Sequence, residues 1–257
     1  MTVLHIACKN GNVELVEYCL SKDSSLLNME DKFGFNAALF AVFYGHMAVF
    51  HILKGERDLK IKSRKTSMNI LHLACQSEKK DTFSEILNDY PDLKRDTDIE
   101  EWNILHYVAK GGNNEILDIL LEDAWASEKL EQDSRNTGKV LQTACLYGHV
   151  EMCRTLISRY PNMLHVRDIE GLHAMHYAAV GGYPEVMRLL KEIVGKMTEE
   201  YIEFTVEDRR IDILQLACVN RKNEMWKFIA NKFPVSYTHL RAHETSLHLV
   251  CRLLLEK

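Results

Sequence analysis

The side chains of this chain that could do chemistry are twelve histidines and seven cysteines, spread over 257 residues. His173 and His176 lie three residues apart, which could place two metal ligands on one face of a helix. A zinc site needs at least three protein ligands, and nothing in the sequence fixes a third beside this pair. No nucleophile stands in a G-x-S-x-G or comparable setting, and the Gly-Gly pairs lack the spacing of a phosphate-binding loop. The sequence therefore predicts no metal, no cofactor, no catalytic residue and no enzyme activity.

Four of the histidines instead recur at one place of a phrase that returns every 33 to 39 residues. The copies occupy residues 2–7, 36–41, 69–74, 103–108, 139–144, 173–178 and 212–217. His5, His72, His106 and His176 hold the same place in it, while His46 and His149 follow a glycine further on. A fixed period near 33 residues is typical of a stacked solenoid. We therefore interpret these histidines as structural, with rings that bond loop backbone and tie neighbouring repeats together.

Each copy predicts a helix, a sharp turn and a second helix. A short polar residue that can cap free backbone N–H groups precedes the apolar run at Thr2, Asn36, Asn69, Asn103 and Asp212. Four residues after the phrase stands a glycine that suits a left-handed turn, at Gly11, Gly45, Gly112, Gly148 and Gly182. Glu78 and Arg221 replace it in the third and seventh copies, which makes those two turns the weakest joints.

These residues resemble the ankyrin repeat, in which T-P-L-H-x-A is followed four residues later by Gly. The resemblance runs from residue 2 to about residue 234, although no copy keeps the Pro and Leu39, Gln142 and Gln215 replace the His. It implies an all-α, helix-turn-helix solenoid with short β-hairpin turns, formed by residues 1–235 as one domain. Residues 236–257 look like a non-native tail or a partial terminal repeat, and both ends favour a fragment of a longer protein.

Two other features bear on the architecture. The longer spacers at 122–138 and 191–211 are rich in Glu and Lys, and we interpret them as extended helix ends or loops. The apolar stretch 37–53 is shorter than the roughly 20 residues that a membrane-spanning helix needs. Because it lies in register with the repeats, we expect two short buried helices and no membrane insertion.

Composition indicates the cellular compartment and the class of partner. A net charge of −5 argues against nucleic acid as the primary ligand, and the basic run 60–65 is expected to be a solvated loop. Cysteines that directly follow the phrase are expected to be buried and reduced; these are Cys8, Cys75, Cys145, Cys218 and Cys251. No stretch of this sequence has the pattern of a signal peptide. We expect a monomer in the cytoplasm or the nucleus.

The resemblance implies a concave groove, formed by the hairpin tips and the exposed side of each first helix. The positions of this groove are unusually apolar, with Phe33, Phe35, Phe43, Tyr44, Met68, Trp102, Tyr147 and Leu172 as the predicted partner-binding residues. Exposed aromatic and Met side chains are enriched at protein–protein interfaces. The function predicted first is a non-catalytic scaffold that binds a peptide or helix of a protein partner.

Two alternatives remain open at this stage. The chain could be the cytosolic ankyrin-repeat arm of a membrane channel of the transient receptor potential type. It could also be the substrate-recruiting adaptor of an enzyme complex. Membrane spans or an appended domain outside this sequence would separate these alternatives from the scaffold.

Overall fold

A computed structural model describes residues 1–56, 61–77, 79–132, 134–169, 171–194, 216–217 and 220–232. The chain divides into two compact units, Met1–Glu122 (unit 1) and Asp123–Lys257 (unit 2). Helices and turns make up the described residues, among which the only strand-like pairing is an isolated bridge between Lys62 and Asn69. The predicted all-α fold is therefore confirmed, and the predicted tail at 236–257 lies outside the described residues.

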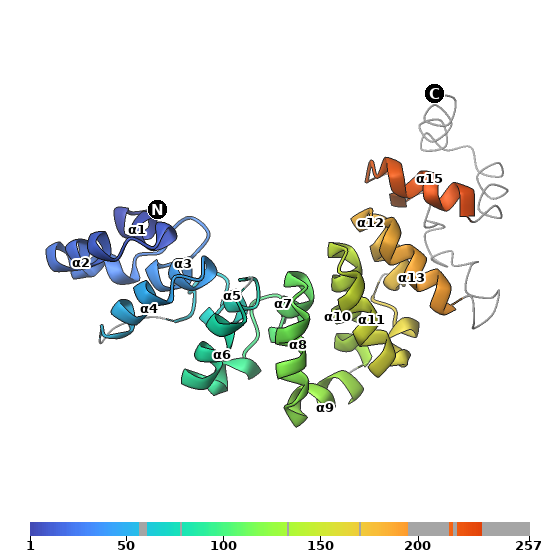
Figure 1. Ribbon diagram of the computed structural model, residues 1–257, viewed down its shortest axis with the longest axis horizontal. Helices are drawn as coiled ribbons and strands as arrows, with labels where there is room; N and C mark the ends of the chain where they lie inside the picture. The colour runs from blue at the N-terminus through green and yellow to red at the C-terminus, as the bar shows by residue number, and fades with distance from the viewer. Residues whose placement is uncertain are drawn as a thin grey trace. The chain divides into compact units, whose positions relative to one another are not determined.

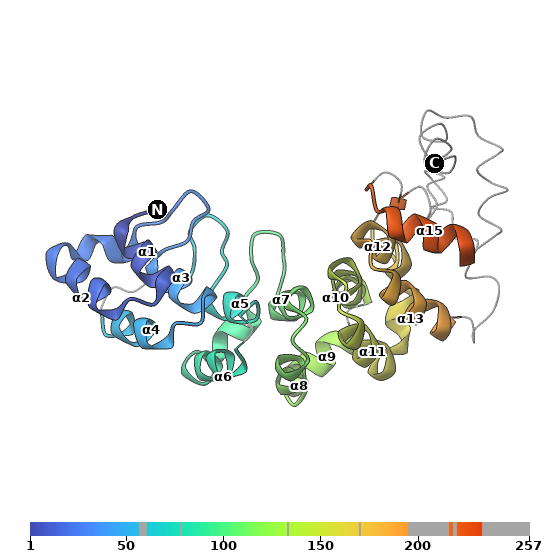
Figure 2. The ribbon, with the colours of Figure 1, turned by 45° about the horizontal axis from the view of Figure 1, so that its top comes forward.

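Unit 1 is a stack of four helix pairs (Figure 1). The first helices of the pairs are α1 (Val3–Asn10), α3 (Ala37–Phe43), α5 (Ile70–Ala74) and α7 (Ile104–Gly111). The second helices are α2 (Val13–Lys22), α4 (Met47–Lys54), α6 (Lys80–Asp89) and α8 (Asn114–Leu121), with short 3₁₀ turns η1 (Ser24–Asn28) and η2 (Pro91–Arg95). Figure 2 shows the first helices as one row and the second helices as another, with the loops between repeats rising beside the first row.

The first helices form the inner row, in which contacts join α1 to α3, α3 to α5 and α5 to α7. In the outer row, formed by the second helices, contacts join α2 to α4 and α6 to α8, and ion pairs of His51 with Glu85 and Lys54 with Asp89 join α4 to α6. The apolar stretch 37–53 is divided between α3 and α4, as predicted. Among the described residues, no helix combines the length and the apolar character needed to cross a bilayer.

Unit 2 continues the pattern after one departure. Its helices are α9 (Ala124–Gln132), α10 (Ser134–Tyr147), α11 (Val150–Arg159), α12 (Ala174–Gly181), α13 (Pro184–Val194) and α15 (Asn223–Lys232), with η3 (Pro161–His165). The repeat phrase at 139–144 lies inside α10, so the helix begins five residues before the phrase, as an extended helix end should. The separate helix α9 was not anticipated. Most of the spacer 191–211 lies outside the described residues.

The predicted helix caps form in unit 1. Thr2, Asn36, Asn69 and Asn103 each accept a hydrogen bond from a backbone N–H of the first helical turn, at 2.9 to 3.4 Å. His173 is also a helix cap, since its Nδ1 accepts a bond from the backbone N–H of Met175 at 3.2 Å. The sequence analysis did not predict this cap. Asp212 lies outside the described residues. Loss of such a cap costs about 1 kcal/mol.

The turn glycines also behave as predicted. All five have a positive φ, between 69° at Gly11 and 82° at Gly148. A second constraint acts at Gly148, where an added Cβ would lie 2.5 Å from the ring of Tyr183. Arg221, which replaces the glycine in the seventh copy, still adopts φ 56° and bears the steric cost of that conformation. Glu78 lies outside the described residues.

Three of the five predicted cysteines lie in the core of the described residues. Cys8, Cys75 and Cys145 are buried and free, while Cys218 and Cys251 lie outside the described residues. Burial raises the pKa of the Cys8 thiol to about 12. These thiols therefore stay protonated and act as small apolar side chains.

Candidate partner-binding surface

Three loops between repeats are built around one aspartate each, whereas in loop 61–69 the Ser63 hydroxyl accepts the backbone bonds. In loop 29–36, Asp31 Oδ1 accepts bonds from the N–H groups of Phe33 at 2.9 Å and Phe35 at 3.0 Å. The Asp31 N–H closes the loop by donating to the carbonyl of Phe35 at 2.9 Å. These bonds fix the backbone of two predicted binding residues.

The same construction recurs in the loops that carry Trp102 and Leu172. Asp98 accepts a bond from the Trp102 N–H at 2.9 Å, and Asp168 accepts one from the Leu172 N–H at 2.9 Å. The second carboxylate oxygen, Oδ2, accepts a bond from a tyrosine of the next helix in both loops, at 2.6 Å from Tyr107 Oη and at 2.7 Å from Tyr177 Oη. Burial, together with the bond to Asp98, raises the pKa of Tyr107 well above its ordinary value. The predicted hairpins are thus compact, side-chain-braced turns.

One loop carries an avoidable strain. Glu101 has φ 62°, whereas the corresponding places in the other aspartate-braced loops hold Gly34 at φ 88° and Gly171 at φ 78°. Replacing Glu101→Gly should raise the free energy of unfolding by about 0.5 to 1 kcal/mol, because relief of the left-handed strain exceeds the added entropy of the unfolded chain. The neighbouring Glu100→Gly is the matched control and should lower it by about 0.5 kcal/mol. Urea unfolding followed by circular dichroism measures both, and equal effects of the two changes would contradict the assignment of strain.

The periodic histidines join the first helix of a repeat to the loop that leads into the next repeat. In His5 and His72, Nδ1 accepts a bond from the cap residue's N–H, at 2.8 Å from Thr2 and 3.3 Å from Asn69. The opposite nitrogen, Nε2, lies 2.9 Å from the Phe35 carbonyl in one case and 3.3 Å from the Asp96 carbonyl in the other, so it carries the proton and donates. The predicted cross-link is confirmed at these two positions.

The remaining members of this set show the same chemistry in part. The Nδ1 atoms of His106 and His176 also accept bonds from the cap residues' N–H groups, both at 3.2 Å. Gln142 stands at the histidine place of the fifth copy and donates from Nε2 to the carbonyls of Val166 and Leu172, at 3.3 and 3.1 Å. His5, His72 and Gln142 thus share a side-chain N–H at this place that faces loop carbonyls, whereas Leu39 of the second copy has none. His46 Nε2 bonds the Lys9 carbonyl at 3.0 Å, which links two successive turns.

The predicted binding residues divide by exposure. Phe33 is 60% exposed, and Phe43, Tyr44 and Tyr147 are 37% to 38% exposed. Phe35, Met68, Trp102 and Leu172 are half-buried. Trp102 in particular stacks on His106 with ring centroids 5.6 Å apart and meets Tyr107 edge-on at 5.8 Å. It offers a partner only part of its ring.

Unit 1 gathers the aromatic members. Phe35 packs edge-on against Phe40, which stacks on Tyr44 at 6.3 Å, and Tyr44 meets Phe43 edge-on at 5.1 Å. The loop-and-inner-helix surface of unit 1 is defined here as loops 29–36 and 61–69 with the exposed sides of α1 and α3. Tyr147 and Leu172 belong to unit 2.

Several exposed apolar side chains were not among the predicted binding residues. Ile6 is 42% exposed, Ile99 is 64% exposed, Ile169 is fully exposed and Tyr183 is 40% exposed. Ile99 and Ile169 directly follow the loop aspartates Asp98 and Asp168, so the aspartate position would have identified both as loop-tip residues.

Lysines accompany the aromatic side chains of unit 1. Lys9 Nζ lies 5.4 Å from the ring centre of Tyr44, and Lys32 Nζ lies 4.7 Å from that of Phe33. Lys65 Nζ donates to the carbonyls of Asp31 and Lys32 at 3.3 and 3.2 Å. The described part of the basic run 60–65 is therefore a loop with exposed cations, as predicted.

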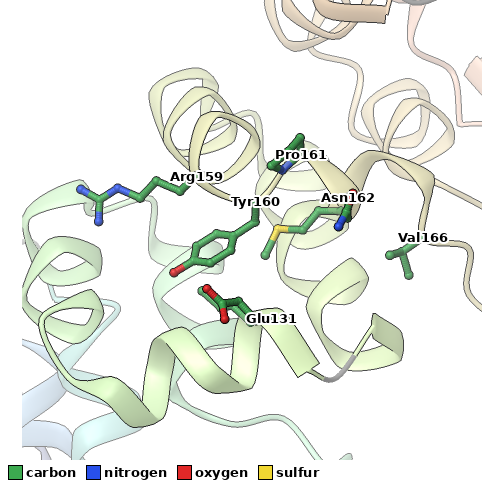
Figure 3. A pocket seen from close by; sticks show the side chains of 8 residues that line it. Glu131, Arg159, Tyr160, Pro161, Asn162 and Val166 are labelled. Carbon is green, nitrogen blue, oxygen red and sulfur yellow. The ribbon is translucent and has the colours of Figure 1, made fainter.

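A small hollow lies in unit 2 (Figure 3). It encloses about 310 Å³ and is lined by Leu130, Glu131, Arg159, Tyr160, Pro161, Asn162, Met163 and Val166. In this view Glu131 lies below the Tyr160 ring, whereas the Arg159 side chain lies above the ring and extends to the left (Figure 3). In the described part of the chain, no group of three His, Cys, Asp or Glu side chains could hold a metal ion.

Comparison with known proteins identifies the repeats. The ankyrin repeat family matches three stretches, residues 1–65, 71–163 and 125–200. Among solved structures, the ankyrin repeat domain of human ASB11 aligns with a TM-score of 0.57 over 90% of this chain and 97% of that one. At 18% identity, this likeness concerns the fold alone.

Curated relatives are matched over part of their length. E3 ubiquitin-protein ligase XBAT33 of Arabidopsis thaliana is 30% identical over 131 residues, which is 50% of this chain and 23% of that protein. Probable E3 ubiquitin-protein ligase XBOS32 of Oryza sativa subsp. japonica is 36% identical over 88 residues, 34% of this chain and 17% of that protein. Human inversin is 26% identical over 198 residues, 77% of this chain and 18% of that protein. The chain thus spans about a fifth of the length of these relatives.

Proposed function

Because this chain belongs to the ankyrin repeat family, whose members are generally protein–protein interaction scaffolds, we propose that it binds a peptide or helix of a partner protein without catalysis of its own. The proposed binding site in unit 1 is the loop-and-inner-helix surface. We extend the proposal to a monomer in the cytoplasm or nucleus, with neither nucleic acid nor a cofactor as ligand.

The observation that carries this proposal is the exposure of aromatic side chains on braced backbone. Phe33, Phe43 and Tyr44 remain 37% to 60% exposed, although large apolar side chains are normally withdrawn from water. Asp31 holds the loop of Phe33 with two backbone bonds, so little conformational entropy is lost when a partner binds. Rigid aromatic anchors of this kind dominate the energy of protein interfaces.

A second candidate is suggested by two of the relatives. XBAT33 and XBOS32 are named as ubiquitin-protein ligases, and in such a setting this array would recruit the substrate. The recruiting surface would be the same, so this candidate differs only in what the rest of a longer protein does. The channel-arm alternative would instead require several apolar spans of about 20 residues elsewhere in a longer protein.

The proposal is tested by selecting peptides from a display library against the full chain. The variant Phe33→Ser/Phe43→Ser should bind the selected peptides at least about 30-fold more weakly, since buried aromatic anchors each contribute about 1 to 2 kcal/mol. Tyr18→Ser is the matched control, because Tyr18 is 60% exposed on the outer helix α2. It should leave peptide affinity unchanged.

Thermal unfolding must accompany this measurement. Wild type and both variants should melt within a few degrees of one another. A large drop in melting temperature for Phe33→Ser/Phe43→Ser would identify these residues as core and withdraw them from the binding surface. Equal peptide affinity for all three proteins would contradict the proposed site.

A further inference from the structure

We infer that the partner segment is acidic, with Asp or Glu side chains beside large apolar ones, and that Lys9 and Lys32 recognise it on unit 1. This inference rests on the proposed function and adds the chemistry of the ligand.

Three lysines of this surface, Lys9, Lys32 and Lys65, meet aromatic rings or carbonyl groups. Lys9 lies over Tyr44 and Lys32 over Phe33. Ion pairs of unit 1 join His51 to Glu85, Lys54 to Asp89, Lys62 to Asp96 and Lys80 to Glu115, so Lys62 of this surface is paired, whereas these pairs include neither Lys9 nor Lys32. The ammonium groups of Lys9 and Lys32 therefore have no carboxylate partner within the described part of unit 1.

The nearby carboxylates are already engaged by backbone. Glu30 Oε1 accepts a bond from the Arg64 N–H at 2.9 Å, and Asp31, only 7% exposed, accepts the two bonds that brace its own loop. Loops 29–36 and 61–69 together carry four cationic and two acidic side chains, a net charge of +2 in a chain whose net charge is −5. The positive charge is thus local to these two loops.

The next loop limits this positive region. Residues 96–102 include Asp96, Asp98, Glu100 and Glu101 and no cation. The two loops adjoin, because the Ile99 N–H donates to the Thr66 carbonyl at 3.1 Å. An acidic segment would therefore be attracted over loops 29–36 and 61–69 and repelled beyond them, which fixes its position along the array.

The aromatic side chains distinguish a peptide from other anions. A lysine over an aromatic ring offers charge and apolar area at one place, which suits a carboxylate next to a Leu or Phe side chain. Nucleic acid and lipid headgroups would use the charge but leave Phe33 and Phe43 exposed to water. A few lysines in a net-acidic chain also supply too few phosphate contacts for firm nucleic-acid binding.

The test uses the peptides selected against the full chain and two charge-reversed variants. Lys9→Glu/Lys32→Glu removes two attractions and introduces two repulsions, so the affinity should fall about 30-fold. Lys22→Glu/Lys80→Glu makes the same charge change on the outer helices α2 and α6 and should leave the affinity within about twofold. The selected peptides should be acidic, and their affinity should fall as salt is raised.

The outcomes separate this inference from the function on which it rests. Neutral or basic peptides that lose affinity with Phe33→Ser/Phe43→Ser but not with Lys9→Glu/Lys32→Glu would overturn the acidic ligand and leave the scaffold standing. Peptides indifferent to both variants, or no selected peptide, would overturn both. A single-stranded oligonucleotide or phosphatidylserine vesicles that bind more tightly than any peptide, and lose this binding on charge reversal, would assign the lysines to another anion.

Discussion

Lowering the pH from about 7.5 to about 5 should reduce the free energy of unfolding of this chain, and His72 alone should account for about 2 kcal/mol of the loss. The ring of His72 is fully buried, with Nδ1 accepting the Asn69 N–H and Nε2 donating to the Asp96 carbonyl. A second proton would occupy Nδ1 and eliminate the acceptor of the cap bond. The ring must therefore stay neutral in the folded chain.

The direction of this change in the free energy of unfolding follows from the pKa of His72 in the folded and in the unfolded chain. Burial lowers the pKa of His72 from 6.5 to about 4, although the bond to the Asp96 carbonyl and nearby carboxylates partly oppose the shift. The unfolded chain therefore takes up a proton near pH 6.5, and the folded chain only near pH 4. The contribution of the neutral ring is complete above the unfolded pKa and is lost as pH falls toward the folded one, by about 1.4 kcal/mol per pH unit between them. Burial also lowers the pKa of His5 and His173, which adds to the loss.

The matched variant is His72→Gln, because the chain itself places Gln142 at this position with its donor bonds intact. It should cost about 1 kcal/mol near pH 7.5, where one cap bond is weakened. Its stability should then fall less steeply with acid than that of the wild type, by about 2 kcal/mol between pH 7.5 and 5. Urea unfolding across this range measures both proteins. If the free energy of unfolding of wild type and of His72→Gln changed with pH in parallel, His72 would not be held neutral in the folded chain.

How far the sequence predicts this structure depends on whether a feature is local. Caps at Asn36 and Asn69 and the turn at Gly45 were predictable because each is decided within a few residues. The histidine cross-link was predictable from periodicity, since His5 and His72 repeat one geometry. A local signal was also present for the loop aspartates, four residues before Phe35, Trp102 and Leu172, but the sequence reading did not use it.

Features that depend on packing were harder to predict from the sequence. The exposure of Trp102 depends on His106 and Tyr107, which lie on the helix that follows it, and an isolated sequence position does not report that stacking. Helix α9 lies outside the repeat phrase, so periodicity gave no guide to it. The binding site was therefore predicted as a set of positions, while the division into exposed anchors and packed residues required the three-dimensional structure.

The Gly-Gly pairs illustrate this difference, and Gly111→Ala should lower the free energy of unfolding by about 2 to 3 kcal/mol. Gly112 supplies the left-handed turn, with φ 73°, which sequence reasoning identified. Gly111 has a separate role, because an added Cβ would collide with the backbone carbonyl oxygen of Cys75 and lie 3.4 Å from the Gln76 Cα. This is where α7 packs against the end of α5, and a backbone carbonyl cannot rotate away as a side chain can.

Helix propensity predicts the opposite sign, since Ala is favoured over Gly by about 1 kcal/mol within a helix. Gly55→Ala is therefore the matched control. Gly55 is exposed at the end of α4 with φ −67°, and the nearest atom to an added Cβ is the Ile52 carbonyl oxygen of the preceding turn at 3.3 Å. That change should stay within about 0.5 kcal/mol of wild type. If urea unfolding finds Gly111→Ala as stable as Gly55→Ala, α5 and α7 must be able to move apart, and the close backbone approach would not limit the packing of the inner row.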